Sequence, residues 1–172
     1  MTVAVNILLF QAGWFACVLG AAHAMPWLGL LGAAAIVAWH LARAAQPGQE
    51  PALVAVAAVL GALFETLLVQ TGWVRFETGV LIEGTAPYWM VALWAIFATT
   101  LNVSLRWLRA RTGLATLFGA IGGPAAYYAG AKLGALELVR TGAALAAIAA
   151  GWAILTPVLL RAARRLDGYA RP

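Results

Sequence analysis

Glu65 is the residue whose type and position point most directly to chemistry, because it is a carboxylate inside a long apolar stretch. An ionised carboxylate in such a setting costs several kcal/mol unless it is paired or protonated. Residues of this kind serve as proton relays or as counter-ions of a ligand, and a neutral glutamate that joins two helices is the structural alternative. Gly61 and Ala62 precede it at helical spacing, so its side chain is predicted to face a neighbouring helix and not lipid.

Amide side chains recur in the other apolar stretches and are further candidates for binding a ligand or handling a proton. Asn6 and Gln11 lie in the first stretch, and Asn102 lies in the fourth. Amides between membrane helices commonly bridge them, with a gain of roughly 0.6 kcal/mol each. A bridging role therefore remains open for each amide, although together they favour a polar interior over a dry one.

Two glycines and a proline, Gly122, Gly123 and Pro124, follow one another in the middle of the fifth stretch. The glycines lower the helix propensity, and the proline removes a backbone hydrogen bond. A kink or a broken helix is therefore predicted at this point. Broken backbone inside a membrane is tolerated only against protein or a water-lined cavity, so a break would mark a site, whereas a kink would serve packing alone.

The sequence offers few groups for other kinds of chemistry. Cys17 is the only cysteine, so an intramolecular disulfide and a thiolate metal cluster are excluded. His23 and His40 fall near opposite membrane faces, which excludes a haem bound by both. There is no nucleophile elbow, phosphate loop, zinc helix or dinucleotide fingerprint. We expect no metal, no cofactor and no catalytic residue; whether the chain is an enzyme stays open, with Glu65 as the one candidate acid or base.

The composition indicates that these groups belong to a membrane protein. Hydrophobic residues make up 64% of the 172 residues and charged residues 10%, against about 25% charged residues in an average soluble domain. A soluble fold would need a polar shell that this chain cannot supply, and lipid removes that need. The net charge of +5 comes largely from basic residues in short loops and near the C-terminus, which fits sorting across a membrane and not nucleic-acid binding.

Six apolar runs predict an all-α, polytopic fold, a six-helix transmembrane bundle that forms a single domain over residues 1–172. Each run can cross a hydrocarbon core of about 30 Å. Eight basic residues lie in the loops or at the ends of the runs on one side and three on the other, so both termini are predicted to lie in the cytoplasm. The predicted spans are 3–22, 27–44, 51–72, 87–107, 113–131 and 139–161.

Small residues predict which spans pack most closely. Lipid chains are as apolar as leucine, so helices associate where small side chains allow close approach of the backbones. Gly119 and Gly123 in the fifth span, and Ala143, Ala147 and Gly151 in the sixth, recur at helical spacing. These two spans are therefore predicted to form a tight antiparallel pair.

Four stretches together resemble a family of small bacterial inner-membrane proteins described as a domain of unknown function, number 2878. They are residues 6–15 (NILLFQAGWF), the region of Glu65, residues 89–107 and residues 119–134 (GAIGGPAAYYAGAKLG). The resemblance covers nearly the whole chain and implies a multi-pass protein of the bacterial inner (cytoplasmic) membrane without an assigned activity. Family members often carry a histidine where this chain has Val103, so no proton-handling role passes to that position. The resemblance highlights Asn6, Gln11, Trp14, Glu65, Asn102, Pro124 and Tyr127.

The first functional hypothesis is the binding or transport of a lipid-like or small amphipathic molecule in an intramembrane polar pocket. Spans one, three, four and five would enclose that pocket, with Glu65 as the charge or proton handle and with walls that include Gln11, Trp14, Asn102 and Tyr127. The alternative is a non-catalytic accessory subunit that docks on a membrane enzyme of lipid metabolism. The expected partners are the lipid bilayer and either a membrane protein or a second copy of the chain, without nucleic acid.

Overall fold

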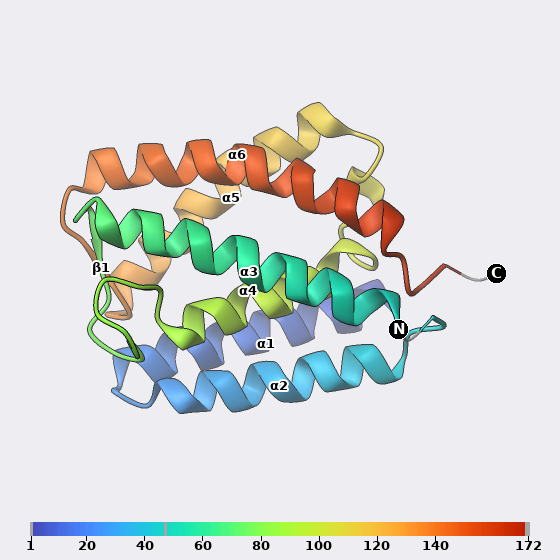
Figure 1. Ribbon diagram of the computed structural model, residues 1–172, viewed down its shortest axis with the longest axis horizontal. Helices are drawn as coiled ribbons and strands as arrows, with labels where there is room; N and C mark the ends of the chain where they lie inside the picture. The colour runs from blue at the N-terminus through green and yellow to red at the C-terminus, as the bar shows by residue number, and fades with distance from the viewer. Residues whose placement is uncertain (1, 47, 171–172) are drawn as a thin grey trace.

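The computed structural model describes residues 2–46 and 48–170, and within these ranges the chain forms six α-helices. Most of the helices run along the long axis of the molecule, and the two termini lie at the same end (Figure 1). The predicted helical fold class is confirmed, although two short strands and one 3-10 helix occur between the helices. The elements are α1 (Val3–Ala22), α2 (Pro26–Ala42), α3 (Gln49–Gln70), β1 (Val74–Arg75), α4 (Tyr88–Leu101), η1 (Arg106–Leu108), α5 (Thr112–Lys132), β2 (Glu137–Leu138) and α6 (Thr141–Arg165).

Three of the described helices, α1, α3 and α6, are long and apolar enough to cross a membrane. Helices α2 and α4 are apolar as well but have only 17 and 14 residues. Large apolar side chains are exposed along most of the helices, with exposed fractions of 68% at Leu8, 66% at Leu67 and 64% at Ile154. Such an exterior indicates a membrane protein, because it is stable in lipid and not in water.

Helix α4 lies at the centre of the bundle and packs against α1, α2, α3 and α6. Most of its residues are buried, among them Trp94, Ile96, Ala98 and Leu101. A helix that is apolar on all sides is stable in this position, because each of its faces meets another helix. The candidate site is therefore built around α4.

Helix α4 ends at Leu101, well before the end of the span predicted at 87–107. Asn6 of α1 explains the difference, because its Nδ2 donates to the Thr99 carbonyl at 3.1 Å and its Oδ1 accepts from the Ser104 amide at 3.2 Å. These bonds satisfy backbone groups where the helix stops, so irregular backbone can be buried there. The predicted extent was wrong because a side chain far away in the sequence fixes the end of the helix.

Helices α5 and α6 form the tight antiparallel pair that their small residues predicted (Figure 1). A Cβ atom at Gly119 would collide with the Trp152 carbonyl, and one at Gly123 would collide with the Trp152 ring. Helix α5 continues through Gly122, Gly123 and Pro124 without interruption, so of the two predicted outcomes, a kink or a broken helix, the broken helix is absent. The close contact with α6 keeps this part of α5 helical despite the backbone hydrogen bond that Pro124 removes.

Two chain connections cover the end of the bundle opposite the termini (Figure 1). Strands β1 and β2 pair in antiparallel register there, and Arg75 forms an ion pair with Glu137 at 3.0 Å. Trp89, near the start of α4, donates from Nε1 to the Thr78 carbonyl at 3.0 Å and so holds the loop between β1 and α4. Because Trp89 also lines the internal cavity, this loop helps to position one end of the candidate site.

Candidate functional site

Glu65 of α3 is fully buried, and its carboxylate joins three helices. Its Oε1 accepts hydrogen bonds from Trp94 Nε1 of α4 at 2.8 Å and from the Tyr127 hydroxyl of α5. Gly61, one turn earlier on α3, makes room for the indole, because a Cβ atom there would collide with the Trp94 ring. The side chain thus points toward neighbouring helices, the direction that Gly61 and Ala62 predicted.

Three buried side-chain atoms in the described part of the chain have no hydrogen-bond partner, namely Glu65 Oε2, Trp152 Nε1 and Thr156 Oγ1. Leaving such an atom unpaired costs about 1–3 kcal/mol, so each one calls for an explanation. Trp152 stands beside the Glu65 cluster, because its ring stacks on Trp94 with the centroids 4.6 Å apart. Thr156 follows one turn further along the same face of α6. One unpaired atom therefore belongs to Glu65 itself, and the other two belong to one face of α6, where Trp152 stacks on a residue that donates to Glu65.

A cavity of about 70 Å³ adjoins this cluster and has almost entirely aromatic and aliphatic walls. Trp94 and Tyr127, the two residues that donate to Glu65, both line it. A cavity of this size holds a few water molecules or one small chemical group, but not a whole lipid. Its aromatic walls are Phe10, Trp14, Trp89, Trp94, Phe97, Tyr127 and Trp152.

A larger groove of about 560 Å³ adjoins the cavity between α1 and α5. Its walls include Gln11 of α1 and Phe118 of α5, and Trp107 lines it near the end of the bundle that carries the termini. Ligand sites in proteins commonly measure about 300–1,000 Å³, and the groove falls in this range. The cavity and the groove lie next to each other and share the wall residues Phe10, Trp14, Phe97, Ala126 and Trp152.

Four of the six predicted candidates meet at this place. Glu65 and Tyr127 are in direct contact, Trp14 lines the cavity, and Gln11 lines the groove. Asn6 and Asn102 lie elsewhere, because both hold the chain at the end of the bundle that carries the termini. Of the residues predicted to line a pocket, Gln11, Trp14 and Tyr127 line the cavity or the groove, whereas Glu65 and Asn102 do not.

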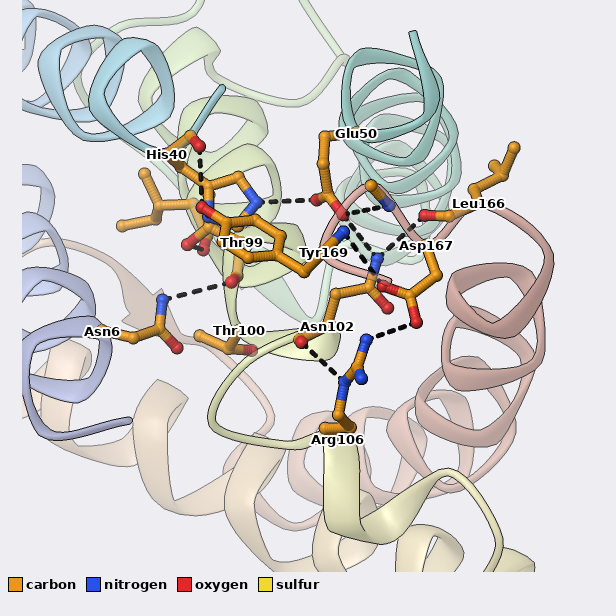
Figure 2. Close-up of polar contacts among 12 residues, drawn as sticks. Asn6, His40, Glu50, Thr99, Thr100, Asn102, Arg106, Leu166, Asp167 and Tyr169 are labelled. Carbon is orange, nitrogen blue, oxygen red and sulfur yellow. Dashed lines mark hydrogen bonds and ion pairs between the residues drawn. The ribbon is translucent and has the colours of Figure 1, made fainter. Parts of the chain in front are cut away.

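A second buried carboxylate, Glu50, lies at the start of α3 and is fully enclosed (Figure 2). Its Oε1 accepts from Asn102 Nδ2 at 2.7 Å and from the Gly168 amide at 2.9 Å. Its Oε2 pairs with His40 Nε2 at 2.7 Å. Both oxygens of Glu50 are therefore occupied by protein groups, unlike those of Glu65.

The segment that follows α6 is held against this network (Figure 2). Asp167 pairs with Arg106 and, at 2.8 Å, with Arg109. The Tyr169 hydroxyl donates to the His40 carbonyl at 2.7 Å. The network therefore joins α2, α3, the chain between α4 and α5, and the residues after α6.

Asp167 and Tyr169 lie beyond the end of α6, and their surroundings shift their acidity. Partial burial by itself would raise the pKa of Asp167, but the hydrogen bond and charge of Arg109, with the charge of Arg106, hold that pKa below its ordinary value. Burial, together with the negative charge of Glu50, raises the pKa of Tyr169 to about 12. Near neutral pH the carboxylate is charged and the phenol is neutral, which are the forms that these bonds require.

Sequence reasoning missed Glu50 and gave His40 no role in the fold. Glu50 precedes the third apolar run and has the sequence position of an ordinary charge at a helix end. The signal that was available is the pair itself, because His40 and Glu50 flank the short connection between two apolar runs and so must lie at the same end of the helix bundle. In the part of the chain that the structure describes, no group of three His, Cys, Asp or Glu side chains could hold a metal ion.

The fold and the site together define a class, an α-helical protein with helices of membrane-spanning type and a buried carboxylate beside an aromatic cavity. The family described as "Protein of unknown function (DUF2878)" matches residues 3–158, and the chain belongs to this family. The matched range includes both buried carboxylates, the cavity and the groove, while Asp167 and Tyr169 lie beyond it. No curated protein and no solved structure matches the chain.

Proposed function

We propose that the chain is a multi-pass protein of the bacterial inner membrane, with all six helices in the bilayer and both termini in the cytoplasm. Pairs of an aromatic ring and a cation near the helix ends support this arrangement, because such side chains anchor a helix at the membrane surface. Arg43 lies over the Trp39 ring at 4.2 Å, and Lys132 lies over the Tyr128 ring at 5.3 Å. The first pair follows α2 toward the end that carries the termini, and the second lies at the opposite end.

The proposed activity is the binding or transport of a lipid-like or small amphipathic molecule in the cavity and groove between α1 and α5. Its apolar part lies in the groove, whose walls suit a hydrocarbon chain. Its polar part lies in the cavity, beside the Tyr127 hydroxyl and with Glu65 directly behind. Glu65 acts as the polar handle of the site through Tyr127 and Trp94, which it holds in place.

The observation that carries this proposal is the contrast between the two buried glutamates. Glu50 is a structural residue, because three protein groups occupy its two oxygens. Glu65 is equally buried, yet its Oε2 has no partner and its other oxygen binds two residues that line a cavity. A buried carboxylate with an unpaired oxygen, joined to a cavity through the two residues that donate to its other oxygen, is the arrangement expected of a functional carboxylate in a membrane.

The test is to purify the protein from its native membranes and to identify the lipids that remain bound, by mass spectrometry of the extracted sample. We expect one lipid class to be enriched over the bulk membrane and its amount to fall about tenfold in Glu65→Gln, on the scale of one hydrogen bond lost from the site. Glu83→Gln, which removes an exposed carboxylate in the loop before α4, is the matched control and should retain the lipid. Bulk lipid composition in the wild-type sample, or equal enrichment in Glu65→Gln, would contradict the proposal.

A further inference from the structure

We infer that the bound molecule is an uncharged lipid whose headgroup oxygen accepts a hydrogen bond from the Trp152 indole N–H. The molecule reaches this position laterally from the bilayer, between α1 and α5. The inference rests on the proposed function and adds to it the chemistry of the ligand and the route by which it arrives.

The first step concerns the direction of the missing hydrogen bond. Trp152 Nε1 is buried and makes no hydrogen bond of acceptable distance and angle among the described residues, although the Tyr127 hydroxyl lies beside it. An indole nitrogen is a donor only, so the group that satisfies it must be an acceptor. Trp152 belongs to the walls of both the cavity and the groove, so a molecule that occupies both passes beside it. The ligand therefore brings an oxygen, as a hydroxyl or a carbonyl, to the place where the two spaces join.

The second step concerns the charge of that headgroup. The described walls of the cavity and the groove contain no Lys, Arg, Asp or Glu side chain. Their polar side chains are uncharged, and a phosphate or ammonium headgroup would lose its hydration there without a counter-ion in contact. Glu65 does not supply one, because Trp94 and Tyr127 line the cavity while Glu65 itself does not. An uncharged oxygen headgroup fits these walls better than either ion.

The third step concerns size and route. The cavity of about 70 Å³ accepts a small headgroup, while the groove of about 560 Å³ has room for a hydrocarbon chain. Phe10 of α1 and Phe118 of α5 stand on the two sides of the groove. Helix α5 packs mainly against α6 and not against α1, so the side between α1 and α5 is where a chain can enter from lipid. The occupant is therefore a lipid of the surrounding bilayer with a slender chain.

The experiment uses the purified full-length protein in lipid nanodiscs and a photoreactive diazirine analogue of dodecanol. Crosslinks are located by mass spectrometry, and dodecanol, dodecane and dodecylammonium are compared as competitors. We expect crosslinks on α1 and α5 near Phe10 and Phe118, and the best competition from dodecanol. In Trp152→Phe the apparent affinity for dodecanol should fall roughly fivefold to tenfold, as for the loss of one hydrogen bond, while that for dodecane stays unchanged.

Trp39→Phe, the same substitution at an exposed position outside the groove, is the matched control and should leave all three affinities unchanged. The quantity compared is the ratio of the affinities for dodecanol and dodecane within each variant. A loss of packing in Trp152→Phe would weaken both affinities, whereas the loss of the hydrogen bond weakens only the affinity for dodecanol. The inference is overturned if Trp152→Phe keeps the preference for dodecanol, or if dodecylammonium competes best. Its failure is distinguishable from that of the proposed function, since native lipid retention could then still depend on Glu65.

Discussion

Glu50 Oε1 accepts a hydrogen bond from Asn102 Nδ2 at 2.7 Å, and this bond joins the first turn of α3 to the residue that caps the end of α4. The same Asn102 amide donates to the Leu166 carbonyl at 2.8 Å, beyond α6. One carboxylate and one amide therefore connect three parts of the chain that are far apart in the sequence. The arrangement fixes the end of α4 and, through it, the segment that contributes Ser104 and Trp107 to the groove.

Replacement of Glu50 by leucine should destabilise the protein by about 3 kcal/mol or more. The substitution leaves the side chains of His40 and Asn102 and the Gly168 amide without their buried acceptor, and each buried polar group left unpaired costs about 1–3 kcal/mol. The measurement is the free energy of unfolding in mixed detergent, followed by circular dichroism. Glu83→Leu, at an exposed position, should change it by less than about 0.5 kcal/mol. Equal effects of the two substitutions would show that the Glu50 network does not hold the fold together.

Much of the helical framework could be predicted from the sequence, because apolar length, small residues and charge at helix ends are local signals. The orientation of Glu65 followed from Gly61 and Ala62, and the pairing of α5 with α6 followed from their small residues. The pairing of Glu50 with His40 could have been expected from the short connection between them, but its bonds to Asn102 and Gly168 could not, because these partners are far away in the sequence. The end of α4 was predicted wrongly for the same reason, because Asn6, which binds the backbone there, is far away in the sequence.

A broken helix was one of the two outcomes predicted at Pro124, and it is absent for a different reason. A local rule describes the hydrogen bond that a proline removes, but not the packing of the same turn against Trp152 of α6. The candidate site shows a similar limit, because residue type pointed to Gln11 and Glu65, and the family resemblance to Tyr127, without showing that Asn102 belongs to another network. Residue types locate polar groups, whereas the tertiary contacts decide which of them meet.

The ion pair of Asp167 should make the stability of the protein depend on pH in the acid range. Partial burial opposes ionisation, but Arg109 and Arg106 more than compensate, so the pKa of Asp167 is lower in the folded state than its ordinary value of 3.8. A lowered pKa stabilises the folded state above about that ordinary value, and the contribution is lost as the pH falls through the folded-state pKa. The free energy of unfolding of the wild type should therefore exceed that of Asp167→Asn near neutral pH, and the difference should shrink on acidification below about pH 4. A difference that stays constant down to about pH 3 would contradict this assignment.

Replacement of Gly119 by alanine should weaken the packing of α5 on α6. A Cβ atom at Gly119 meets the Trp152 carbonyl and Thr156 Oγ1, and the carbonyl belongs to the backbone and cannot turn away. Overpacking of this kind costs about 1–3 kcal/mol. Gly122→Ala in the same helix is the control, because nothing lies within 4 Å of the added atom, and its stability should be unchanged or slightly higher. The measurement is the thermal unfolding of the two variants under the same conditions. If Gly119→Ala is as stable as the wild type, helices α5 and α6 can move apart without a loss of stability.

Removal of the Tyr127 hydroxyl should impair lipid retention more than it impairs folding. In Tyr127→Phe the ring still lines the cavity, but Glu65 Oε1 loses one of its two donors, so the polar end of the site loses its fixed geometry. We expect the lipid that copurifies with the wild type to fall about fivefold to tenfold, with a loss of unfolding free energy of about 1 kcal/mol.

Tyr128→Phe is the matched control for this prediction, because Tyr128 is the next residue of α5 and is 47% exposed. It should retain the lipid at the wild-type level. If both variants retain it equally, the Glu65–Tyr127 contact serves only to join α3 to α5, and the site must lie elsewhere in the groove. If only Tyr127→Phe releases the lipid while its unfolding stays close to that of the wild type, the buried carboxylate and its phenol act on the ligand as well as on the fold.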